Sequence, residues 1–152
     1  MLHIEIVKQS DGSGLLRCRR ADGSVTWQKQ SGRHAAFFAY HDLTHYAVET
    51  VLREIPGFYT LIAEGWEIED TTGKGARGPI PPDAVVIEQL VGLFDAQRGS
   101  GVIWTTEEFN SFSPLPLTAE QLEAIRKRRG ELFRRWNEVP VGGKLLLEFP
   151  DL

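Results

Sequence analysis

The chain has 152 residues, of which 41% are hydrophobic and 25% are charged, and its formal net charge is −4 at pH 7. This length and balance are typical of a folded domain with a buried core, and they exclude a largely disordered chain. The negative net charge disfavours a general nucleic-acid binder, because phosphate contacts need a basic face.

The single cysteine, Cys18, cannot form an internal disulfide and has no second thiol with which to share a zinc ion. No apolar run approaches the roughly 18 residues that a membrane-spanning helix needs. The first residues, MLHIEIVKQSDG, lack the basic region and the long apolar segment of a signal peptide. We therefore expect a single domain over residues 1–152, located in the cytoplasm and not in a membrane.

Three short strands are predicted at the start of the chain. The segments LHIEIV, LLRCRR and VTWQKQ alternate apolar and polar residues, and the sequences SDGSG and ADGS between them are typical of turns. The alternation places Leu16 and Cys18 on the apolar face of the second strand, and Val25 and Trp27 on that of the third. Because short Asp-Gly turns favour hairpins, the three strands should form an antiparallel meander.

The rest of the chain is predicted to be mostly helical, ending in a strand at KLLLEF. Helices are expected over residues 34–55, 58–70 and 83–97, and after the capping-box pairs Thr105/Glu108 and Thr118/Gln121. In the first helix, the apolar side chains gather into one stripe that excludes Asp42. The predicted fold class is α+β, with an antiparallel sheet packed on one face by several helices.

The segment HDLTHYAVE contains the clearest chemical pattern. His41, His45 and Glu49 follow one another at intervals of four, so on a helix they lie on one face with about 6 Å between successive side chains. Two imidazoles at this spacing can bind one metal ion, as they do in helical zinc sites. The pattern predicts a divalent-metal site, and zinc is the ion that we expect.

The third metal ligand stays open among three residues. Glu49 lies two helical turns from His41, about 12 Å along the axis, and reaches the same ion only by bending back. His34 shares the face of His41 if the helix begins early enough. Glu88 lies in an apolar run of a predicted helix, where a carboxylate is costly unless another group pairs with it.

The five residues HDLTH resemble the H-E-x-x-H motif of zinc metallopeptidases, with Asp42 in place of the family's glutamate. The resemblance implies that Asp42 acts as a general base on metal-bound water, although its side chain is one methylene shorter. Asp42 is equally suited to cap a helix or to hold a histidine from behind. Glu49 is the other candidate for proton transfer.

Two functions of different classes follow from this sequence. The first is a small metal-dependent protein, namely a hydrolase acting on a small molecule or a peptide. The alternative is a non-catalytic binding or homo-oligomerising domain, in which the histidines and Glu49 form a polar edge of the helix. The basic segment 126–135 is predicted to be a solvated helix face, with contact to phosphate or to an acidic partner as the alternative.

Overall fold

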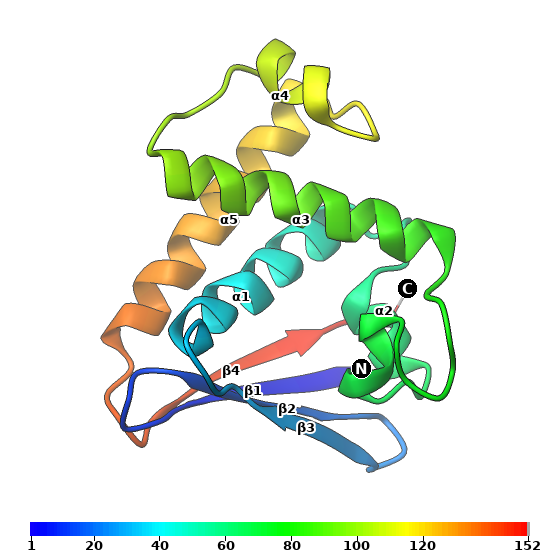
Figure 1. Cartoon of the computed structure of the whole chain (residues 1–152), viewed down its shortest axis with the longest axis vertical. Helices are drawn as coiled ribbons and strands as arrows, with labels where there is room; N and C mark the ends of the chain where they lie inside the picture. The colour runs from blue at the N-terminus through cyan, green and yellow to red at the C-terminus, as the bar shows by residue number, and fades with distance from the viewer. Residues whose placement is uncertain (152) are drawn as a thin grey trace.

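The computed structural model describes residues 1–151, in which an antiparallel sheet is covered on one face by helices (Figure 1). The strands are β1 (Leu2–Lys8), β2 (Gly14–Arg19), β3 (Val25–Lys29) and β4 (Lys144–Phe149), in the spatial order β3-β2-β1-β4. The predicted meander is β1 to β3, and the C-terminal strand joins it by pairing with β1. The α+β fold class is confirmed.

The helices follow the predicted order with some changes in length. They are α1 (Ala35–Val51), α2 (Phe58–Ala63), the 3-10 helix η1 (Ile68–Thr72), α3 (Pro82–Ser100), α4 (Thr106–Phe112) and α5 (Ala119–Glu138). Both predicted capping boxes are present, at the starts of α4 and α5. The helix expected over 58–70 ends early, because Gly65 takes a left-handed conformation with φ 111°.

The predicted orientation of β3 is wrong. Register pairs Cys18 with Thr26, so Thr26 shares the covered face with the buried Cys18, and Trp27 points away with 62% of its surface exposed. The buried hydroxyl of Thr26 is not left unpaired, because it accepts a hydrogen bond from the backbone N–H of Ile68 at 3.1 Å. Register with the covered strand β2 thus outweighs the hydrophobicity of Val25 and Trp27.

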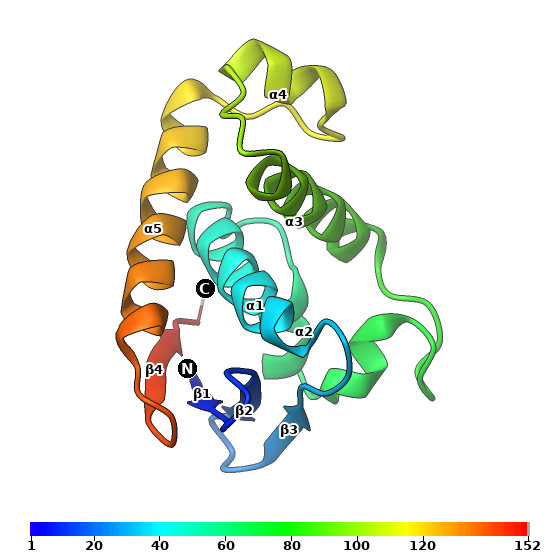
Figure 2. The ribbon, with the colours of Figure 1, turned by 60° about the vertical axis from the view of Figure 1, so that its left-hand side comes forward.

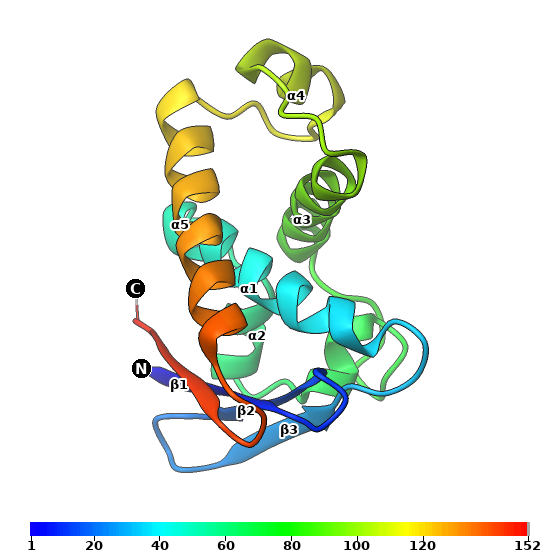
Figure 3. The same cartoon turned by 90° about the vertical axis from the view of Figure 1, so that its left-hand side faces the viewer.

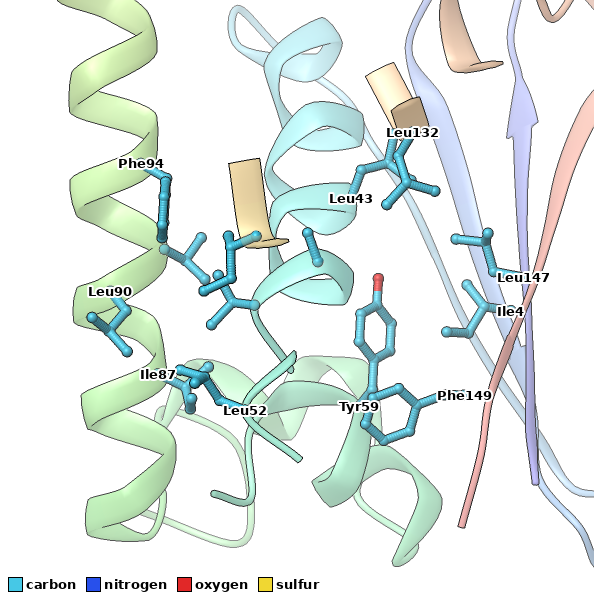
Figure 4. Packing of buried hydrophobic residues seen from close by; sticks show 14 of the residues in the cluster. Ile4, Leu43, Leu52, Tyr59, Ile87, Leu90, Phe94, Leu132, Leu147 and Phe149 are labelled. Atoms are coloured by element: carbon cyan, nitrogen blue, oxygen red, sulfur yellow. The ribbon is translucent and has the colours of Figure 1, made fainter. Parts of the chain in front are cut away.

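Helix α1 lies at the centre of the molecule. It packs against β2, α2, α3 and α5, and Figures 2 and 3 show it between α3 and α5 and above the sheet. Figure 4 shows the packing on both sides of this helix, with Ile87, Leu90 and Phe94 on α3, and Ile4, Leu147 and Phe149 on the strands. Among the described residues, no helix combines the length and the apolar character needed to span a bilayer.

The central position of α1 also corrects the prediction of one apolar stripe. The buried residues of α1 are Ala35, Ala39, Asp42, Leu43, Thr44, His45, Ala47, Val48 and Glu49. Because neighbours surround the helix on several sides, its polar side chains are inside the protein as well as its apolar ones. Buried polar groups need partners, and the partners of these groups define the candidate site.

Candidate metal centre

Two histidines from α1 and one glutamate from α3 come together beside the core. The Nε2 atom of His45 lies 2.8 Å from Oε2 of Glu88, and the Nε2 atom of His41 lies 3.4 Å from Oε1 of the same carboxylate. Each of the three residues offers a ligand atom, and these atoms all lie within 4.8 Å of one another. Two imidazoles and a carboxylate at this spacing can hold one divalent ion.

A second carboxylate lies behind each histidine. The Nδ1 atom of His41 is 2.7 Å from Oδ2 of Asp95, and the Nδ1 atom of His45 is 2.9 Å from Oε2 of Glu49. Since an ionised carboxylate only accepts hydrogen bonds, we assign a ring hydrogen to Nδ1 in both residues, and in the metal-free cluster Nε2 also carries one toward Glu88, which a metal ion would displace. In a neutral ring this tautomer leaves the Nε2 lone pair free for a metal ion.

Glu49 therefore takes a different place from Glu88. It contacts the opposite ring nitrogen of His45, it is only 1% exposed, and its Oε1 atom accepts a hydrogen bond from the backbone N–H of Tyr59 at 2.9 Å. Both of its oxygens are engaged by N–H donors. The structure thus places Glu49 behind a histidine and not beside the atoms that converge.

The other two predicted site residues, His34 and Asp42, lie in different surroundings. His34 is exposed at the N-cap position of α1 and does not belong to the clustered group. Asp42 is buried, and its Oδ2 atom accepts a hydrogen bond from Nε2 of Gln30 at 3.2 Å. Asp42 therefore faces the interior and does not lie outside the buried part of the helix.

The paired charges shift the pKa values of the cluster. Burial alone lowers the pKa of both histidines, but hydrogen bonds to carboxylates outweigh it: Asp95 and Glu88 raise the pKa of His41 to about 9, and Glu49 and Glu88 raise that of His45 to about 10. Burial raises the pKa of Glu88, yet the two histidines bring it well below its usual value. Without a metal ion, the cluster is thus a network of imidazolium and carboxylate groups.

Burial has the opposite net result for Asp42. It raises the pKa of this carboxyl group to about 7, although the positive charges of His41 and His45 act to lower it. Asp42 consequently holds a proton more readily than an ordinary aspartate does.

The cluster faces a cleft of about 470 Å³. His41, Asp42, His45 and Glu88 all line it. The other lining residues are Gln28, Lys29, Gln30, Ser31, Phe38, Phe58, Ile68, Thr71, Thr72 and Ile80. A larger hollow of about 610 Å³ lies at β1, β2 and β4 and contains none of the clustered residues. We place the candidate site in the smaller cleft because the convergent polar groups are there.

Sequence reasoning did not identify Asp95. This residue follows Glu88 by seven positions on α3, which is two helical turns, so both carboxylates lie on the face that meets α1. The seven-residue interval predicts that both carboxylates share one face of the helix. It connects Asp95 to the site only when α1 and α3 are known to be neighbours.

Comparisons with known proteins add no family to this geometry. The chain matches no protein-family model, and neither the curated proteins nor the solved structures gave a match. The interpretation of the site therefore depends on its own atoms.

Proposed function

We propose that His41, His45 and Glu88 bind one divalent metal ion and that the protein uses it to catalyse a hydrolytic reaction. The observation that supports this most is the convergence of the two Nε2 atoms on Glu88, while carboxylates hold both Nδ1 atoms from behind. Three protein ligands next to a cleft are typical of catalytic zinc sites, which keep a position open for water.

Zinc is the ion that we favour, because imidazole and carboxylate groups are its usual ligands at catalytic sites. Two histidines and one carboxylate also form the donor set of many Fe(II) enzymes, so iron is included in the test below. When bound, such an ion lowers the pKa of a bound water to near 7 and polarises a substrate carbonyl.

Asp42 is the residue to which we assign proton transfer. It lines the same cleft as the three ligands, and Gln30 orients its carboxyl group through a hydrogen bond. A carboxyl group in this position can take a proton from water during attack and return it to the leaving group. Glu49 is less suited to this role, because both of its oxygens already accept N–H donors.

The lining of the cleft suits a substrate that has both polar and apolar groups. Its wall combines amide and hydroxyl side chains with the apolar surfaces of Phe38, Phe58 and Ile80, and Lys29 also lines it. We therefore expect an ester or amide of a small molecule or a peptide.

A metal-free structural role is the second candidate. Its support is that Glu88 already contacts both Nε2 atoms, at 2.8 and 3.4 Å, so the cluster can pair its own charges. In that case an internal ion network joins α1 to α3, and its members are His41, His45, Glu49, Glu88 and Asp95. The domain would then bind a partner or a second copy of the chain without catalysis.

The experiment that tests hydrolysis compares metal-stripped protein with protein reloaded with Zn²⁺ or, under anaerobic conditions, Fe²⁺. The probes are p-nitrophenyl acetate, p-nitrophenyl phosphate and a quenched fluorescent peptide mixture. We expect metal-dependent turnover of the ester or the peptides, and Asp42→Asn should lower kcat about a hundredfold to ten-thousandfold while metal stays bound. Asp83→Asn, at an exposed position, is the control. A metal-loaded protein inactive on all three probes would contradict hydrolysis.

A further inference from the structure

Gly57 lies directly against the carboxylate of Glu49. A Cβ atom built on this buried glycine would be 2.6 Å from Cδ and 2.7 Å from Oε1 of Glu49, closer than real Cβ atoms come to a neighbour. The backbone of Gly57 has φ −122°, a value that any residue adopts. A side chain at this position would therefore force the carboxylate of Glu49 to move, whereas the backbone conformation itself sets no restriction.

The same turn supplies a donor to Glu49. Gly57 is the N-cap of α2, and two residues later the backbone N–H of Tyr59 donates to Oε1 of Glu49 at 2.9 Å. The phenol of Tyr59 donates to the carbonyl of Asp42 at 2.9 Å, which fixes α2 to α1 at a second point. The start of α2 thus packs closely on Glu49 and also hydrogen-bonds it.

Glu49 transmits this arrangement to His45. Its second oxygen, Oε2, lies 2.9 Å from Nδ1 of His45, and both side chains are almost fully buried, at 1% and 4% exposed. A carboxylate fixed in this place keeps the hydrogen of the ring on Nδ1 and the ring plane aimed at Glu88. The partner of His41 is less constrained, since Oδ1 of Asp95 has no hydrogen-bond partner among residues 1–151.

We propose that Gly57 and the backbone N–H of Tyr59 position Glu49, which in turn fixes the tautomer and orientation of His45 for metal binding. This inference rests on the proposed metal centre, and it makes Glu49 and Gly57 positioning residues and not ligands. Outer partners of metal-bound histidines are typically worth about 10–100-fold in metal affinity. We expect losses of that size when either residue is changed.

The test is a double-mutant cycle on Zn²⁺ affinity, measured by competition with a chromophoric chelator. Gly57→Ala and Glu49→Ala should each weaken binding about 10–100-fold. The double variant should bind no more weakly than Glu49→Ala, because shortening residue 49 removes the group that the new methyl displaces. Gly92→Ala is the matched control, since a Cβ there would meet no atom within 4 Å apart from its chain neighbours and the backbone of its own helix, among the described residues.

Thermal unfolding of wild type, the two single variants, the double variant and Gly92→Ala measures their folding. If the crowding destabilises Gly57→Ala, the double variant should regain melting temperature relative to it, and this gain alone supports the contact. Additive losses of affinity in the double variant would overturn the inference, as would wild-type affinity in Gly57→Ala.

A spectroscopic measurement on metal-free protein separates this inference from the metal proposal. In wild type, NMR should show a slowly exchanging Nδ1–H proton of His45, hydrogen-bonded to Glu49, and the signal should be lost in Glu49→Ala and Gly57→Ala. If the signal behaves so but wild type binds no Zn²⁺, the metal centre fails and the positioning role stands. If wild type binds Zn²⁺ and the signal is unchanged in both variants, the positioning role fails alone.

Discussion

His41 and His45 share one helix, yet different parts of the fold hold them. Asp95 of α3 accepts the hydrogen bond from His41, and Glu49, held by the start of α2, accepts that from His45. Glu88 faces both rings from the opposite side. The orientation of each imidazole is therefore fixed through both of its nitrogens, which is the preorganisation that a metal site needs.

Glu88→Gln tests the single carboxylate that faces both rings. The substitution keeps the size of the side chain but removes its charge, so Zn²⁺ affinity should fall by roughly tenfold or more, given that ligating carboxylates are charged donors. Isothermal titration with Zn²⁺ measures the change. Glu131→Gln, at an exposed position on α5, should bind as wild type does. Equal affinities in the two variants would remove Glu88 from the ligand set.

The shifted pKa values predict how the stability of metal-free protein depends on pH. The pKa values of His41 and His45 are about 9 and about 10 in the folded state, against 6.5 for an ordinary histidine. Their contribution is complete below pH 6.5 and is lost as the pH rises through the folded values. Urea unfolding should show a lower free energy of unfolding at high pH than at neutral pH. With saturating Zn²⁺ this loss should be absent, because the metal replaces the protons.

The residue types of the site were more predictable from sequence than their roles. The i, i+4 histidine pair identified His41 and His45, and the cost of a carboxylate in an apolar run identified Glu88. Spacing alone did not distinguish a residue whose atoms converge with the histidines from one that lies behind them. The difference between Glu49 and Glu88 depends on which ring nitrogen each one faces, and this follows only from the packing of α1 against α2 and α3.

At the level of elements, α1 differs most from its prediction. A helix covering a sheet is expected to bury one stripe, but α1 also packs against α2, α3 and α5. The orientation of β3 was wrong for a similar reason. Thr26 is small enough to be buried, and its hydroxyl accepts a hydrogen bond from a backbone N–H. Strand β3 can therefore present Thr26 to the core in place of Trp27. Periodicity gives the existence of an element more reliably than its surroundings.

A variant at the N-cap of α5 should change the stability of the protein without changing the candidate site. The hydroxyl of Thr118 accepts a hydrogen bond from the backbone N–H of Gln121 at 3.0 Å, and the Oε1 atom of Gln121 accepts one from the backbone N–H of Thr118 at 2.9 Å. Thr118→Ala should lower the free energy of unfolding by about 1 kcal/mol. Chemical denaturation measures this loss, and Thr118→Ser should retain most of the stability. Zn²⁺ affinity should be unchanged in both variants, since α5 supplies no member of the cluster.

At the scale of the whole molecule, the proposed ligands come from two helices, α1 and α3, which are separated by about 30 residues of chain containing α2, η1 and a Gly/Pro-rich loop. An ion bound between them would link the central helix to the outer layer. The sheet, its meander and most helices could be predicted from local sequence. The adjacency of α1 and α3 could not, because it depends on packing between distant segments.

Metal binding between two helices should stabilise the entire fold. A ligand that binds only folded protein, present at about 100 times its Kd, adds about 2.7 kcal/mol to the free energy of unfolding. For a chain of this size, that corresponds to a rise in Tm of roughly 5–10 °C. Differential scanning fluorimetry with Zn²⁺ and with chelator measures the shift. His41→Ala/His45→Ala should show no shift, and an equal shift in this variant would indicate binding elsewhere.

The most direct test of the metal centre is the metal content of protein purified without a histidine tag. Elemental analysis of wild type should find close to one divalent ion per chain, and His41→Ala/His45→Ala, purified in parallel, should contain almost none. Wild type that is folded and active in no metal-dependent assay, with no bound metal and no uptake of added Zn²⁺ or Fe²⁺, would contradict the proposal. The cluster would then be the internal ion network of the second candidate.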